Sequence, residues 1–131
     1  MLNFFYPYGL FLLIEITVTL TGDVKQRWGE VEGTYVLVPR SVNGRSYWVK
    51  TDGTHSTHAI WHDNYSYLWR IGSIGDLGSD SVSALKTDFG TSDQGLPYQI
   101  NSWMYHVTYS SGTQEWFHTD DIVVESSAGM F

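Results

Sequence analysis

The feature that most constrains the fold is a series of turn dipeptides that divide the central chain into short segments. Asn43-Gly44, Asp52-Gly53 and Asp63-Asn64 separate segments of alternating apolar and polar residues. The Asn-Gly pair favours a tight hairpin, because both central residues of a type I′ turn take positive φ. Parallel strands would need crossovers of about a dozen residues, and these gaps leave no room for them. The sequence therefore predicts an all-β protein built as a single antiparallel meander.

Eight segments have the alternation and the β-branched or aromatic content expected of strands. They are residues 14–20, 33–42, 45–51, 58–62, 66–71, 100–109, 114–119 and 121–125. We expect about seven to nine short strands that form a small sandwich or an open barrel. Pro39, near the end of the second segment, indicates a bulge or an edge position there.

The chain has 131 residues, the length of one ordinary domain. Residues 28–125 are expected to form a single β domain, followed by a small polar tail at residues 126–131. Within the domain, residues 72–95 are rich in Gly, Ser and Asp and predict a long loop. Residues 1–27 are expected to form a separate N-terminal segment.

Two interpretations of the N-terminal segment stay open. Residues 14–20 alternate in a period of two, which predicts a strand that pairs at an edge of the sheet. The alternative is a signal peptide or an anchor, because residues 4–20 are nearly all apolar. No Lys or Arg precedes the apolar stretch, however, and Glu15 would be costly inside a membrane. A membrane is therefore an expected partner only if residues 4–20 act as an anchor.

Charge and cysteine content exclude several classes of function. Seven Lys and Arg residues against 14 Asp and Glu residues give a net charge of −7. Because attraction to phosphates needs a basic face, we expect no nucleic-acid partner. The chain has no cysteine, so it forms no disulfides, thiolate metal sites or cysteine nucleophiles.

A string of residues in the central chain resembles a short β module of secreted multidomain proteins. The string consists of Gly33-Thr34-Tyr35, Val42-Asn43-Gly44-Arg45 with Tyr47-Trp48, Ala59-Ile60-Trp61, and Trp69 with Ile71-Gly72. The resemblance covers residues 33–116 and implies adhesion or recognition rather than catalysis, in an extracellular or surface-associated setting. Copies of that module usually carry cysteines near their end, which this chain lacks, and no ligand residues carry over from it.

Aromatic residues make up 16% of the chain, more than a domain of this size can bury completely. The alternation along each strand assigns rings such as Tyr47, Trp61 and Tyr67 to the core. The remaining rings predict a binding face, on which flat aromatic rings stack on sugar rings and polar side chains bind hydroxyl groups. The candidate ligand-binding residues are Trp48, His62, Tyr65, Arg70, His106 and Phe117.

Two groups of residues invite a metal interpretation. His55, His58 and His62 are spread along an extended strand, so they cannot converge on one ion without cross-strand partners. We expect these histidines to be exposed or hydrogen-bonded. The loop of residues 76–93 contains four aspartates among glycines. We expect a solvated loop, and a calcium site is the alternative. Otherwise we expect no cofactor and no metal.

The function predicted from these patterns is a non-enzymatic recognition or adhesion module that binds a glycan or a protein. One alternative is a structural or assembly protein that self-associates through its aromatic surface and its N-terminal strand. A second alternative is a small hydrolase that uses His and Asp residues, although the sequence has no nucleophile elbow, no H-E-x-x-H motif and no P-loop.

Overall fold

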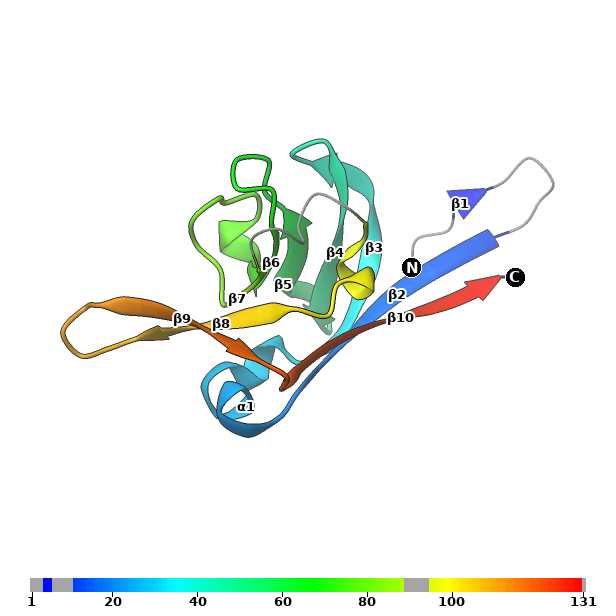
Figure 1. Ribbon diagram of the computed structural model, residues 1–131. Coiled ribbons are helices and arrows are strands. Elements are labelled where there is room, and N and C mark those ends of the chain that lie inside the picture. The colour runs from blue at the N-terminus through cyan, green and yellow to red at the C-terminus, as the bar shows by residue number, and fades with distance from the viewer. Residues whose placement is uncertain (1–3, 6–10, 89–94, 131) are drawn as a thin grey trace.

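The computed structural model describes residues 4–5, 11–88 and 95–130 of the chain. In this part of the chain, ten strands form one antiparallel sheet that curls into a nearly closed barrel (Figure 1). The expected all-β antiparallel meander is confirmed. Along the sheet, the strands follow chain order from β1 to β9, and β10 pairs with β2.

Eight of the ten strands overlap the segments expected from the alternation, whereas β1 and β7 were not expected and β10 extends beyond residue 125. The strands are β1 (Phe4–Phe5), β2 (Phe11–Leu20), β3 (Gly33–Val42), β4 (Arg45–Asp52), β5 (His55–His62), β6 (Trp69–Ser73), β7 (Leu85–Thr87), β8 (Trp103–Thr108), β9 (Gln114–Thr119) and β10 (Ile122–Met130). The helix α1 covers Gly22–Trp28, and three 3-10 turns cover Gly29–Val31 (η1), Ile74–Asp76 (η2) and Pro97–Gln99 (η3).

The β3–β4 hairpin has the turn that its sequence predicts. Asn43 and Gly44 take φ angles of 54° and 78°, and Val42 pairs directly with Arg45. Positive φ at both central residues is the signature of a type I′ turn. The register between β3 and β4 shifts between Leu37 and Ser41. Pro39 lies inside this shift. Because proline has no backbone N–H, it cannot donate to the hydrogen-bond ladder, and the irregularity agrees with the bulge expected there.

The two ends of the chain lie side by side in the sheet (Figure 1). β2 pairs with β3 on one side and with β10 on the other, so it is an interior strand and not the edge strand that we expected. Ser126 pairs with Ile16, and β10 continues to Met130. Residues 126–130 therefore belong to the sheet instead of forming a separate tail.

Both faces of the central strands are covered by apolar residues. On the inner face, Leu37, Trp48 and Ile60 are cross-strand neighbours in β3, β4 and β5, and they belong to the main core. On the outer face, a second cluster consists of Val38, Tyr47, Ala59 and Trp61. Ile74 and Leu77 pack against this second cluster. The segment between β6 and β7, residues 74–84, was expected to be part of a loop and instead covers the outer face. We call it the covering segment.

The helix α1 connects β2 to β3 and was not expected from the sequence. Its last residue, Trp28, packs against the main core, and its indole Nε1 donates a hydrogen bond of 2.8 Å to the carbonyl of His106. Near its start, Asp23 accepts a hydrogen bond from the hydroxyl of Tyr105. These contacts hold α1 against β8. Among the described residues, no helix is long and apolar enough to cross a membrane.

Candidate functional site

Three of the six predicted ligand-binding residues are buried. Trp48, His62 and Arg70 expose only 1%, 1% and 3% of their surface. The prediction of an exposed face that carries these side chains is therefore wrong. There are two physical reasons. Both faces of this barrel are covered, and the three residues do not share a face: Trp48 lies on the inner face, whereas Arg70 pairs with Trp61 on the outer face.

Arg70 has a structural role that accounts for its burial. Its guanidinium Nε lies 2.7 Å from the carboxylate of Asp63, whose side chain is fully buried. The other guanidinium nitrogens donate to the hydroxyl of Ser83 and to the carbonyl of Asp80, at 3.0 and 2.7 Å. A buried ion pair of this kind is stabilised only when its remaining hydrogen-bonding groups are satisfied, as they are for this guanidinium. Arg70 thus joins β6 to the covering segment.

The carboxylate of Asp63 also shapes the turn between β5 and β6. It accepts hydrogen bonds from the backbone N–H groups of Tyr65 and Ser66. The turn exposes 79% of Tyr65 and 54% of Tyr67. Tyr65 is accordingly exposed as predicted, whereas Tyr67 was assigned to the core. Tyr67 takes a φ of 59°, which breaks the alternation of strand faces at that position.

The other two predicted residues lie on the β8–β9 hairpin. The ring of Phe117 packs on Tyr105 at a centroid distance of 5.8 Å. His106 lies directly opposite Trp116 in the register of the hairpin and lines a cavity. The structure does not gather the six predicted residues into one site, and it places only His106 at this cavity.

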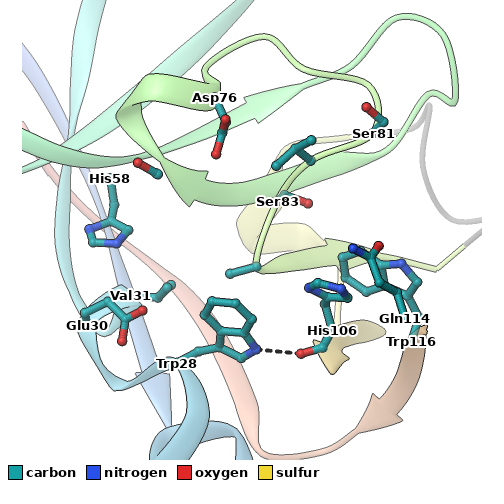
Figure 2. A pocket seen from close by; sticks show the side chains of 13 residues that line it. Trp28, Glu30, Val31, His58, Asp76, Ser81, Ser83, His106, Gln114 and Trp116 are labelled. Atoms are coloured by element: carbon teal, nitrogen blue, oxygen red, sulfur yellow. Dashed lines mark hydrogen bonds between the residues drawn. The ribbon is translucent and has the colours of Figure 1, made fainter. Parts of the chain in front are cut away.

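The cavity has a volume of about 220 Å³ and is formed by elements that are distant in sequence. Figure 2 shows Trp116 and Gln114 on one side, His58, Glu30 and Asp76 toward the other side, and Trp28 and His106 between them. The lining also includes Ser73 and the segment from Ser81 to Ala84.

Three rings form a continuous aromatic wall in this cavity. Trp28 stacks on His106 with a centroid distance of 6.0 Å and an interplanar angle of 22°. His106 in turn lies 5.2 Å from Trp116, at 32°. The ammonium of Lys86 lies over the Trp116 ring, 4.1 Å from its centroid. We call the rings of Trp28, His106 and Trp116 the aromatic wall.

The polar part of the lining includes a histidine with an unusual environment. His58 is half-buried, and its buried Nδ1 atom has no hydrogen-bond partner among the described residues. Burial lowers the pKa of His58 below its usual range, and the nearby Lys50 ammonium lowers the pKa further. The imidazole is therefore neutral over a wider pH range than an exposed histidine.

Three residues that line the cavity, Trp28, His58 and Trp116, were not among the predicted ligand-binding residues. For Trp116 the sequence did contain a usable signal. The turn at residues 110–112 predicts a β8–β9 hairpin, and its register places Trp116 opposite His106. Trp28 was not recognisable, because α1 was not expected. His58 comes to the cavity through the pairing of β5 with β6, in which it faces Ser73.

The residues considered for a metal site do not converge in the described part of the chain. No group of three or more His, Asp or Glu residues there could hold a metal ion. Asp93, one of the four aspartates considered for calcium, lies outside the described residues. Two histidines contact polar groups: His106 Nε2 lies 3.1 Å from the Thr108 hydroxyl, and His118 lies 3.7 Å from Asp88. These contacts belong to different histidines and do not form a chain of hydroxyl, imidazole and carboxylate.

Comparisons with known proteins returned no match, whether to family models, to curated proteins or to solved structures.

Proposed function

We propose that this protein is a non-enzymatic recognition module that binds a saccharide in the cavity at the aromatic wall. The observation that carries the proposal is the stack of Trp28, His106 and Trp116 along a cavity with a polar opposite side. Ligand sites are typically concave, with aromatic surface for affinity and a few polar groups that fix orientation.

The chemistry of the cavity suits a sugar ring in two respects. The parts of the aromatic wall that its own ring contacts leave exposed offer apolar surface to the C–H groups of a pyranose. The hydroxyl groups of the same sugar need donors and acceptors, which His58, Gln114 and Ser81 provide. A binding role in an extracellular or surface-associated setting, as expected from the sequence, accords with this chemistry and stays a prediction.

The test is a titration of the purified protein against a panel of oligosaccharides, followed by the variant Trp116→Ala. We expect at least one saccharide to bind, and we expect Trp116→Ala to weaken its binding by about tenfold or more, which corresponds to about 1.4 kcal/mol. Far-UV circular dichroism of the variant confirms that it remains folded.

The matched control is Tyr65→Ala, which also removes one aromatic ring. Tyr65 is the most exposed ring of the described chain, but it does not line the cavity. We expect its removal to leave saccharide binding unchanged. The proposal is wrong if no saccharide binds, or if Tyr65→Ala weakens binding as much as Trp116→Ala does.

A second candidate function, assembly with copies of itself, rests on a different observation. Among the described residues, β10 pairs with β2 alone, which leaves the other edge of this nine-residue strand unpaired. Unpaired strand edges bind further strands unless charge, proline or a bulge prevents it. In β10 the charged residue is Glu125, and 43% of Val123 is exposed. The interface expected at the N-terminal strand would in this case use β10 instead, because β2 is paired on both sides.

The assembly candidate is tested by light scattering over a range of protein concentrations. A dimer that dissociates to a monomer in the variant Val123→Lys supports pairing at β10, because a charge at the edge opposes strand addition. The variant Val82→Lys is the control, since Val82 is also exposed but lies outside the strands. A monomer at all concentrations contradicts this candidate.

A further inference from the structure

Two carboxylates that line the cavity have no protein partner among the described residues. Glu30 and Asp76 both line it, and neither side chain makes an ion pair or a hydrogen bond with the described residues. Figure 2 shows both on the side away from Trp116, with the Asp76 carboxylate directed toward the interior of the cavity. The two carboxylates thus add negative charge to the part of the cavity away from Trp116.

The basic residues near the cavity do not neutralise these carboxylates. Lys50 directs its ammonium to the backbone carbonyls of Glu30 and Glu32, at 2.6 and 2.7 Å. Lys86 holds its ammonium over the Trp116 ring. The described lining itself includes no Lys and no Arg, and its two histidines are His58 and His106. A ligand with a positive charge would therefore supply what the cavity lacks.

The aromatic wall already holds one cation of the chain, which shows that positive charge is compatible with this part of the molecule. The face of an indole ring carries negative potential and attracts cations within about 6 Å of its centroid. The chain already shows this attraction at the wall, because the Lys86 ammonium lies 4.1 Å from the Trp116 centroid. Burial lowers the pKa of Lys86, so this ammonium is held in spite of a desolvation cost. Aromatic rings together with carboxylates are a suitable environment for a substituted ammonium group.

We infer that the saccharide taken up by the cavity is an amino sugar with a free, protonated amine. This inference rests on the proposed function and narrows it to one class of ligand. The amine lies between the carboxylates of Glu30 and Asp76, while the sugar ring contacts the aromatic wall. The net charge of −7 attracts cationic ligands and repels anionic sugars at a distance.

The experiment compares two ligands that differ at one group. A glucosamine trimer and an N-acetylglucosamine trimer share the same rings, but only the first carries amines that can be protonated. We expect the protein to bind the glucosamine trimer at least about tenfold more tightly at low ionic strength, with a difference that shrinks as salt is added. The N-trimethylated trimer, whose charge does not titrate, keeps this preference.

The variants Glu30→Gln and Asp76→Asn connect the preference to the cavity. Each is expected to reduce the preference, measured as the ratio of the dissociation constants of the two trimers, by several-fold. Glu125→Gln removes an equal charge from β10, away from the cavity, and is the matched control.

The outcomes separate the inference from the proposed function. Equal binding of both trimers through Trp116 overturns the inference and leaves saccharide binding in place. Preference for the amine that persists in both carboxylate variants overturns the assignment of the amine to Glu30 and Asp76. If no saccharide of either kind binds, the proposed function fails and the inference fails with it.

Discussion

The two ends of the β5–β6 pair carry similar residue types in very different surroundings. At one end, His58 and Ser73 open onto the cavity with its half-buried aromatic wall. At the other end, His62 and Trp69 lead into the turn that exposes Tyr65 and Tyr67 (Figure 1). The first end has concave shape and unpaired polar groups, whereas the second has exposed rings on a convex turn.

This contrast shows that exposure alone does not identify a site. We call the β5–β6 turn, which carries Tyr65 and Tyr67, the tyrosine turn. The charged groups next to it already have partners: Asp63 and Arg70 form an ion pair, and both also bind backbone groups. At the cavity, the carboxylates of Glu30 and Asp76 form no ion pair with any residue that the structure describes. A ligand gains more from groups that the fold has left unsatisfied than from groups that are already paired. The predictions below test this difference.

The largest effect is expected for Arg70→Met, which leaves the Asp63 carboxylate buried without its cation. We expect the free energy of unfolding, measured by urea denaturation, to fall by about 3–5 kcal/mol. Arg27→Met breaks the exposed pair between Arg27 and Asp23, and it is expected to leave the free energy of unfolding nearly unchanged because solvent screens that pair. A similar decrease in the free energy of unfolding for the two variants would show that the buried pair of Asp63 and Arg70 does not stabilise this end of the β5–β6 pair.

The next effect concerns Gly72, at the place where the covering segment approaches β6. A Cβ atom at Gly72 would lie 3.1 Å from the Ser83 Cα and 3.3 Å from the Trp61 ring. Gly72→Ala is expected to destabilise the protein by about 1–3 kcal/mol in thermal or urea unfolding. At Gly29 the added atom meets nothing within 4 Å and φ is −55°, so Gly29→Ala should be neutral or slightly stabilising.

A smaller effect is expected at the β3–β4 turn. The side-chain amide of Asn43 donates to the carbonyls of His62 and Gly78, both at 3.1 Å. Asn43→Gly keeps the positive φ and removes these hydrogen bonds. The free energy of unfolding, measured by urea denaturation, should therefore fall by about 1 kcal/mol. Asn64→Ala, an exposed asparagine on the tyrosine turn, serves as the comparison and should be near neutral. An equal loss of unfolding free energy in the two variants would contradict the role of Asn43 in linking the hairpin to the covering segment.

The smallest effect is a pH dependence at the cavity end. Burial and then Lys50 lower the pKa of His58, so the unfolded chain binds its proton at a higher pH than the folded protein does. This contribution to stability is fully present above the ordinary histidine pKa of about 6.5 and decreases as the pH falls through that value. We expect His58→Gln to flatten the fall in urea midpoint between pH 7.5 and pH 5.5. An unchanged slope would contradict the assignment.

Much of the local structure could be predicted from the residues themselves. The bounds of β3 and the Asn43-Gly44 turn follow from alternation and turn chemistry, which act between near neighbours. The helix α1 escaped prediction because its seven residues have little periodic pattern and depend on contacts with β8. Tyr67 was misassigned because its positive φ interrupts the regular alternation.

The sequence by itself determined most of the strands and the hairpin turns between neighbouring strands, because these depend on residues close together in the chain. The pairing of β2 with β10 joins distant segments and was decided by the tertiary structure. Only the tertiary structure decided which side chains are accessible. The sheet curls so that Trp48 enters the main core, and the segment after β6 covers Trp61 and Arg70 on the other face. The cavity likewise exists only where α1, β5, β8 and β9 meet, because burial and concavity depend on contacts between distant segments.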